Sequence, residues 1–111
     1  MKPLLWVRRS RDEVRAFPPD ARREAGYQLG RVQFGAEPVD WRAMPEIGPG
    51  VCEIRIHGAV ERRVLYVAKF PEAVYVLHAF EKRSRRTTRL NLDVARRRWR
   101  ALAALRAGRK P

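Results

Sequence analysis

The stretch VCEIRIHGAVERRVLYVAKFPEAVYVLHAFE, residues 51–81, sets the architecture that this sequence predicts. Its first part alternates Cys52, Ile54 and Ile56 with polar residues, which is the pattern of a strand with one buried and one wet face. Two further apolar runs follow after short turns, so the sequence predicts three strands: Val51–His57, Arg62–Lys69 and Val74–Glu81. Because short turns join antiparallel neighbours, we expect an antiparallel meander.

A short strand and two helices are predicted before this meander. Leu4–Val7 is typical of a short buried strand, and the spacing of Ser10 and Glu13 predicts a capping box that opens a short helix. A second helix is predicted over Pro19–Phe34, with Gly35 at its C-terminal cap. Its inner face is an apolar stripe formed by Ala21, Ala25, Leu29 and Val32.

The remaining segments are a loop and a C-terminal helix. Residues 36–50 are rich in proline and glycine, which predicts a loop that Trp41 and Met44 attach to the core. After the meander, a helix is predicted from about Asn91 onward. Its apolar stripe consists of Leu92, Ala95, Trp99, Leu102 and Ala103. These elements predict an α+β fold in a single domain over residues 1–111.

Composition narrows the class of protein. The chain has 111 residues and 45% of them are hydrophobic, which fits one folded domain. A lone cysteine, Cys52, and the lack of Cys/His ligand spacings give no reason to expect a disulfide, a metal site or another cofactor. No apolar run approaches the roughly 20 residues of a membrane span, and Met1–Val7 is too short for a signal peptide. We therefore expect a cytoplasmic protein without a membrane partner.

Positive charge is concentrated at the C-terminal end. The chain has 25 Lys and Arg against 12 Asp and Glu, a formal net charge of +13, and residues 82–111 account for +11 of it. Such a field attracts polyanions, and each phosphate that a cation neutralises adds affinity through counterion release. RNA or DNA is therefore the expected partner, while a solvated helix face that keeps the protein soluble is the alternative.

Polar side chains on the predicted sheet form a candidate site. Glu53, Arg55 and His57 lie two residues apart and project from one face, and a hairpin register brings Arg63 close to them. The third strand continues into the basic run KRSRR, residues 82–86. Metal-free RNA cleavage needs cations around the phosphate and a group that moves a proton from the 2′-hydroxyl. The alternative is a cross-strand polar ladder of Glu53, Arg55 and Arg63.

Two histidines are further candidates. His57 has an ordinary pKa near neutrality, which suits a general base, but its position beside Gly58 favours a solvent-exposed turn histidine. His78 follows Val74 and Val76 at a period of two, which favours a buried structural histidine over a site residue.

Four segments carry a family resemblance. They are FPPDARREAGYQL (17–29), EIRI (53–56), RVLYVAK (63–69) and LHAFEKRS (77–84). In this order and spacing the chain resembles the phage-derived, HigB-like branch of the RelE/ParE toxin superfamily, from Leu4 to about Leu105. The resemblance implies a RelE-like fold with two N-terminal helices packed on a small curved antiparallel sheet, plus a C-terminal helix.

The same resemblance implies a function. It implies a toxin of a type II toxin–antitoxin system, an endoribonuclease that acts on translated mRNA at the ribosome. In that family the 2′-hydroxyl attacks the adjacent phosphate without a metal or other cofactor. The implied partners are the ribosome, mRNA and a helix-turn-helix antitoxin.

Site residues follow from the resemblance by position. Arg55, Arg63 and Lys82 match family sites that bind or polarise the phosphate. Glu53 stands where relatives can have a lysine, so a proton-transfer role is assigned to it as a candidate, together with His57. RNA and ribosome contacts are expected from Arg83, Arg85, Arg86, Arg89, Arg96, Arg97 and Arg100.

The catalytic base and the target stay open at this point. Thr87 and Thr88 occur where the best-characterised nucleases of the family have a tyrosine. The same fold includes ParE-like toxins that inhibit DNA gyrase through protein contacts, because a fold does not determine a function. A non-catalytic nucleic-acid-binding module that uses only the C-terminal helix is a further alternative.

Overall fold

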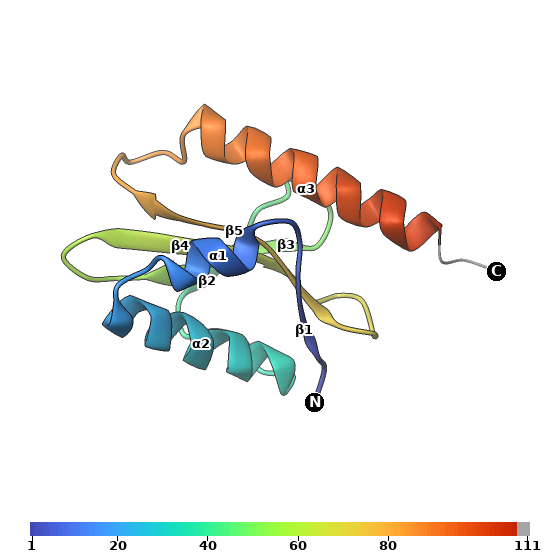
Figure 1. Ribbon diagram of the computed structural model, residues 1–111, viewed down its shortest axis with the longest axis horizontal. Coiled ribbons are helices and arrows are strands. Elements are labelled where there is room, and N and C mark those ends of the chain that lie inside the picture. Colours follow the sequence, from blue (N-terminus) through green and yellow to red (C-terminus); the bar gives the residue numbers. More distant parts are fainter. Residues whose placement is uncertain (109–111) are drawn as a thin grey trace.

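A five-stranded sheet with helices on both faces makes up the computed structural model of this protein, which describes residues 1–108 (Figure 1). In chain order the elements are β1 (Leu4–Trp6), α1 (Ser10–Arg15), α2 (Pro19–Gln33), β2 (Trp41–Ala43), β3 (Val51–Ile56), β4 (Glu61–Val67), β5 (Val74–Lys82) and α3 (Arg89–Ala107). This α+β arrangement confirms the fold class predicted from the sequence.

The sheet has the order β1-β5-β4-β3-β2. The strands β3, β4 and β5 pair antiparallel, as the alternating stretch predicted. The sheet is mixed, however, because β1 adds a parallel edge strand beside β5. The prediction of a loop throughout residues 36–50 was wrong for three residues, since β2 pairs with β3 at the opposite edge. An edge strand this short is compatible with the surrounding prolines and glycines.

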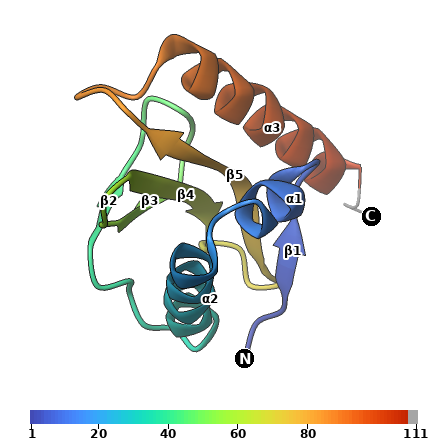
Figure 2. The same ribbon diagram turned by 60° about the vertical axis from the view of Figure 1, so that its left-hand side comes forward.

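Figure 2 shows α1 and α2 on one side of the sheet and α3 on the other. An apolar cluster fills each of these two faces. The cluster under α1 and α2 includes the predicted stripe of α2, together with Ile54, Val64 and Val76. The cluster under α3 includes Leu65, Val67, Leu77, Ala95 and Leu102. A sheet buried on both faces explains why β4 and β5 are nearly continuous apolar runs.

The helix ends follow from local chemistry. Gly35, with φ of 89°, lies just after α2, and its N–H donates to the Val32 carbonyl at 3.0 Å, as predicted for a C-terminal glycine. At the start of α3, the Thr88 hydroxyl accepts a hydrogen bond from the Asn91 N–H. The helix α3 therefore begins two residues before the predicted Asn91.

The predicted capping box at Ser10 and Glu13 was wrong. The Ser10 side chain is buried and makes no capping hydrogen bond. The Glu13 carboxylate instead accepts hydrogen bonds from the Arg98 guanidinium at 2.7 and 2.8 Å and from the Ala79 N–H at 3.2 Å. These tertiary donors bind the carboxylate more strongly than the start of its own helix could, because Arg98 is charged.

His78 is a buried structural histidine, as predicted. A β-bulge shifts the register so that Leu65 faces His78 while Tyr66 faces Val76, which moves His78 off the face that Val76 occupies. Its Nδ1 lies 2.9 Å from Glu13 and its Nε2 lies 2.8 Å from Asn91. His78 thus links α1, β5 and α3.

Glu13 is the most strongly perturbed member of this buried network. Burial raises its pKa, but hydrogen bonds from His78 and Arg98 outweigh that effect and lower the pKa to about 2.

No helix within residues 1–108 has both the length and the apolar character of a membrane-spanning segment.

Candidate active site

The strands β3 and β4 bring three predicted site residues together. In their antiparallel register Arg55 lies directly opposite Arg63, which confirms the hairpin register expected from the sequence. Glu53 precedes Arg55 by two residues and therefore faces the same side of the sheet, toward α3. This side carries the apolar cluster at one end and these polar residues at the other.

Glu53 is buried, contrary to the wet face predicted for its strand. Its side chain is 2% exposed, although those of its neighbours Arg55 and Arg63 are 31% and 8% exposed. The Arg55 Nε donates to Glu53 Oε1 at 3.4 Å, and the Arg63 Nε lies 3.7 Å from the same oxygen. The carboxylate therefore has two guanidinium neighbours at long range, and only one of them forms a hydrogen bond.

Arg63 is held by a second carboxylate. Its Nη1 donates to Glu61 Oε1 at 3.0 Å and to the Arg62 carbonyl at 3.0 Å. Its Nε is buried without a hydrogen-bond partner among the described residues. Arg63 is therefore a fixed, buried cation close to the Glu53 carboxylate, while Arg55 is the more accessible of the two arginines.

A pocket of about 250 Å³ opens next to Glu53. The pocket is lined by Arg42, Met44, Glu46, Glu53, Lys82, Arg85, Arg86, Thr87 and Leu92. Four of these side chains are cationic and two are carboxylates, so the lining carries net positive charge. The basic run after β5 therefore reaches Glu53 at the end of the sheet, as predicted, but Arg55 and Arg63 are not among the lining residues of the pocket.

The cations of this pocket differ in how they are paired. Arg42 lies 3.5 Å from Glu46, whereas Lys82, Arg85 and Arg86 have no ion-pair partner among residues 1–108. Arg83, beside them, donates to Glu81 at 2.8 Å. Unpaired cations around a hollow are available to an anionic ligand.

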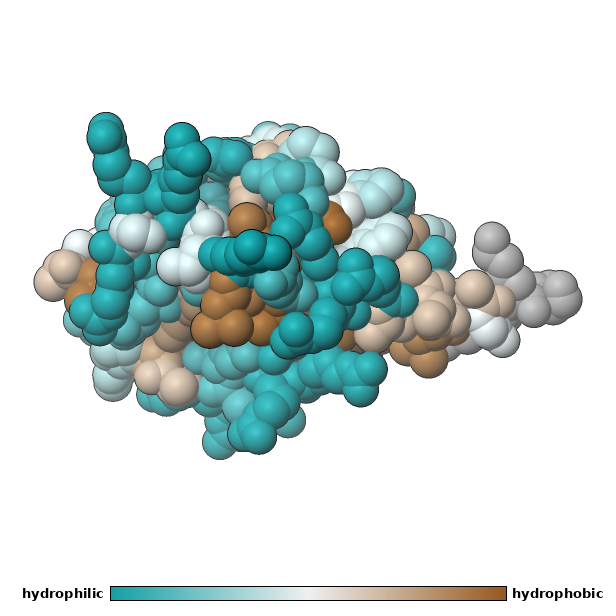
Figure 3. Space-filling view, turned by 90° about the horizontal axis from the view of Figure 1, so that it is seen from above, coloured by the Kyte–Doolittle hydropathy of each residue, from teal (hydrophilic) through white to brown (hydrophobic). Residues whose placement is uncertain are grey.

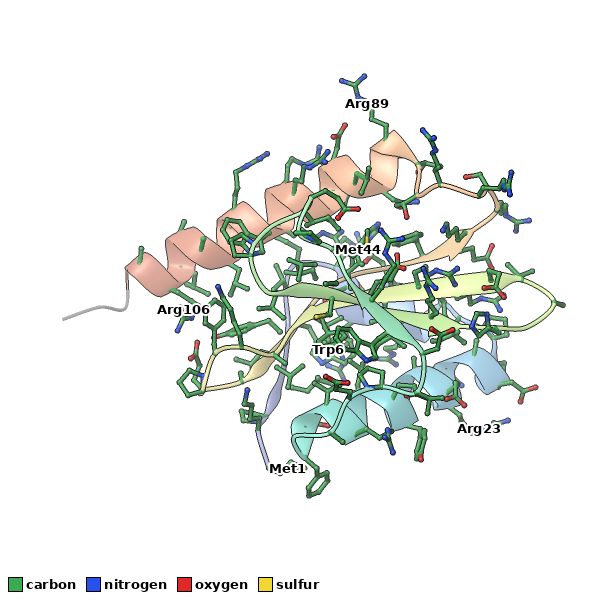
Figure 4. The ribbon with its side chains drawn as sticks, turned by 180° about the vertical axis from the view of Figure 1, so that it is seen from behind. Met1, Trp6, Arg23, Met44, Arg89 and Arg106 are labelled. Carbon is green, nitrogen blue, oxygen red and sulfur yellow. The ribbon has the colours of Figure 1, made fainter. Side chains whose placement is uncertain are left out.

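Basic side chains also extend along α3. Arg96 donates to the Glu46 carbonyl at 3.1 Å, and Arg89 lies at 4.0 Å from Asp93. Arg97 and Arg100 are exposed and have no ion pair among the described residues. Figure 3 views the molecule from the α3 side and shows hydrophilic residues over most of this face. In Figure 4 Arg89 points away from the fold, while Met44 lies between α3 and the sheet.

Most of the chain is similar in sequence to a known protein family. The family model of phage-derived proteins like Gp49 (DUF891) matches residues 12–100, which is most of the chain. The chain belongs to the Gp49-like family. This family is of the RelE toxin type, and it is related to the toxins of toxin–antitoxin systems. No curated protein matches the chain in sequence.

His57 of this Gp49-like chain does not join the pocket. It follows β3 at the hairpin, its side chain is 58% exposed, and its Nε2 and Nδ1 lie 2.5 Å from Asp40 and 2.8 Å from Glu61. The hydrogen bond to Asp40 raises the pKa of His57 above its ordinary value, and Glu61 adds to the effect. The structure thus confirms the exposed turn histidine that its position beside Gly58 favoured.

Sequence reasoning missed two charged residues of the pocket. Arg42 lies on β2 directly opposite Glu53, and Glu46 follows in the next loop. Only the pairing of β2 with β3 brings them to the site, and the short β2 had no strand signal. Within residues 1–108 no group of three His, Cys, Asp or Glu side chains could hold a metal ion. The pocket of this Gp49-like protein is lined by two carboxylates, Glu46 and Glu53, and four cations.

Proposed function

We propose that this Gp49-like protein is the toxin of a type II toxin–antitoxin system, a HigB-like endoribonuclease that cuts translated mRNA at the ribosome. The observation that supports this proposal is the pocket of about 250 Å³ that the buried Glu53 lines together with Lys82, Arg85 and Arg86, three cations without an ion-pair partner among residues 1–108. A buried base beside a cationic phosphate site is what metal-free RNA cleavage requires.

The proposed reaction is an internal transfer of the phosphate. The 2′-oxygen forms a bond to the adjacent phosphorus while the bond from phosphorus to the 5′-oxygen breaks. Glu53 accepts the proton of the 2′-hydroxyl, and the leaving 5′-oxygen takes a proton from the solvent or from Lys82. The products are a 2′,3′-cyclic phosphate on the upstream fragment and a 5′-hydroxyl on the downstream fragment.

Each cation has a distinct part in this scheme. Arg55 and Lys82 contact the phosphate and neutralise the charge that develops on its oxygens. Arg63 is buried against Glu53 and Glu61, so it fixes the carboxylate and adds positive potential from below. Arginine suits both parts because its guanidinium stays charged at any pH of interest.

Docking to RNA is assigned to basic residues at the rim of the pocket, where Arg85 and Arg86 line it, and beyond it. Arg83, Arg85 and Arg86 lie in the loop after β5, and Arg89, Arg96, Arg97 and Arg100 follow on α3. Their charge suits ribosomal RNA during cleavage. A helix-turn-helix antitoxin with an acidic surface would bind the same basic side chains and exclude RNA. We propose that the toxin is held inactive in this way.

The test compares two double variants with the same change of charge. Arg55→Gln with Lys82→Gln removes the cation bonded to Glu53 and one cation that lines the pocket. Arg22→Gln with Arg23→Gln removes two exposed cations of α2, and Figure 4 shows the position of Arg23. Cleavage of mRNA on translating ribosomes should fall by roughly a hundredfold or more in the first variant and stay near wild type in the second. Circular dichroism verifies that both variants fold.

Other outcomes separate the alternatives. Unchanged cleavage in the pocket variant would exclude this pocket as the site. Intact mRNA with blocked DNA gyrase would identify a ParE-like inhibitor. Salt-dependent binding of nucleic acid with neither toxic effect would identify a binding module.

A further inference from the structure

A second hollow has no part in the proposed cleavage. It has a volume of about 440 Å³ and lies between β1 and the C-terminal half of α3. It is lined by Leu5, Trp6, Val7, Arg8, Tyr75, Ala101, Leu102 and Leu105, and we call it the β1 groove. Leu5 and Leu105 are 40% and 53% exposed, so large apolar side chains face solvent in a concave surface. Such surfaces are typical of docking sites.

The backbone of β1 borders this groove. Leu5–Arg8 are four consecutive lining residues, and since alternate side chains of a strand point to opposite faces, the strand edge must contribute to the wall. The strand β1 ends the sheet, and in the part of the chain that the structure describes its one strand partner is β5. Within residues 1–108, Leu4–Trp6 make no backbone hydrogen bond outside that pairing. An open strand edge beside an apolar hollow accommodates an extended peptide better than a helix.

The two flanks of α3 differ in character. On the flank toward the pocket are Arg96, which contacts Glu46, and Leu92, which lines the pocket. On the flank toward the groove, Leu90, Val94, Ala101 and Leu105 recur at helical spacing and are partly or fully exposed. Figure 3 shows paler and hydrophobic residues gathered toward the C-terminal end of the described part of this face. The exposed Arg97 falls on this same row of α3, so it is the lining residues that distinguish the groove from the pocket.

Charge indicates which occupant the groove accepts. The lining residue Arg8 is cationic and exposed, and Arg9 beside it is also exposed. The chain as a whole has a formal net charge of +13. Two copies would repel one another, whereas an acidic segment would be attracted.

We propose that the β1 groove binds an extended segment of another protein in which apolar and acidic residues alternate. The segment adds as a strand to the free edge of β1, its apolar side chains contact Leu5 and Leu105, and its carboxylates face Arg8 and Arg9. This docking surface is independent of RNA cleavage, because it shares no lining residue with the pocket.

Nuclear magnetic resonance of the full-length chain tests the proposal. The probe is a short capped peptide that alternates valine and glutamate, added at physiological ionic strength to the ¹⁵N-labelled protein. The amide signals of Leu4–Arg8 and Ala101–Leu105 should shift in a saturable way. The same peptide with lysine in place of glutamate should bind at least roughly tenfold more weakly, because the protein is strongly cationic.

A matched pair of variants separates the groove from general attraction. Leu105→Glu places a carboxylate in the groove and should weaken binding roughly tenfold or more, since an apolar contact is lost and an acidic partner is repelled. Leu90→Glu makes the same change at an exposed position of α3 outside the groove and should have less than roughly a twofold effect. Both positions are exposed, so both variants should fold.

Several results would overturn the proposal. These are no saturable shift, shifts confined to the loop after β5, equal effects of the two variants, or equal binding of the lysine peptide. Light scattering that gives twice the mass of one chain, with loss of the dimer in Leu105→Glu, would assign the groove to a second copy. Cleavage of mRNA should be unchanged in both variants. The peptide titration measures binding and not cleavage, so it tests the groove even if the protein does not cut mRNA.

Discussion

Replacing Glu13 by glutamine removes the charge at the centre of the buried network that joins α1, β5 and α3. In the wild-type protein the carboxylate accepts two hydrogen bonds from Arg98 and lies 2.9 Å from His78. Glutamine keeps the shape of the side chain but leaves the Arg98 guanidinium without its counter-charge. The variant therefore isolates the electrostatic part of the network.

The pKa of Glu13 gives the magnitude. It is lowered from 4.5 to about 2, which at about 1.4 kcal/mol per pKa unit corresponds to about 3 kcal/mol of stabilisation. Because the folded pKa is depressed, this stabilisation is fully present above pH 4.5 and is lost as the pH falls toward 2. The difference between wild type and Glu13→Gln should be about 3 kcal/mol at pH 7 and about half of that near pH 3.

Chemical denaturation at several pH values measures this difference. Asp12→Asn is the matched control, since Asp12 lies on the same helix and forms an exposed pair with Arg9 at 3.4 Å. That control should change the free energy of unfolding by less than about 0.5 kcal/mol at any pH. If wild type and Glu13→Gln show the same dependence on pH, the charged network does not stabilise the fold and the reasoning is refuted.

Two further predictions concern a glycine contact and a histidine pair. Gly48→Ala should destabilise the protein by about 1–3 kcal/mol in denaturation experiments, because the new Cβ would lie 2.6 Å from the Trp99 ring. Gly26→Ala, where the new Cβ would have no atom within 4 Å beyond its chain neighbours and its own helix backbone, should stabilise the protein by about 0.5–1 kcal/mol. Equal effects of the two substitutions would contradict this account. The pKa of His57, measured by NMR, should lie above 6.5 and return toward 6.5 in Asp40→Asn. Because the folded pKa is raised, the pair with Asp40 stabilises the fold slightly at lower pH, and this stabilisation is lost as the pH rises through the folded pKa. An unshifted His57 would show that the pair with Asp40 does not persist in solution.

Local patterns predicted the elements whose signals lie within one segment. The alternation at Cys52, Ile54 and Ile56 and the apolar stripe of α2 each state which face is buried, and short turns fix the order of the central strands. The opposition of Arg55 and Arg63 followed from that pairing. These features needed no information from distant parts of the chain.

Features that depend on distant contacts could not be predicted. Glu53 is buried because α3 and the loop after β5 cover its face of the sheet. The sequence of the strand itself does not indicate that these segments pack there. The bulge that reorients His78 adds one residue to β5 without a glycine or other local marker. The capping-box pattern failed because Arg98, 85 residues away in sequence, binds the same carboxylate.

The chemical ends of cleaved RNA test the central claim most directly. Purified protein is incubated with ribosomes that carry a defined mRNA, and the fragments are compared with those from an mRNA with a single 2′-deoxy nucleotide at the cut position. If the pocket at Glu53 directs attack by the 2′-hydroxyl, the all-ribose mRNA gives a 2′,3′-cyclic phosphate and a 5′-hydroxyl, and the 2′-deoxy mRNA stays intact at that position. Cleavage of the 2′-deoxy mRNA at the same position, or fragments with 5′-phosphates, would contradict it.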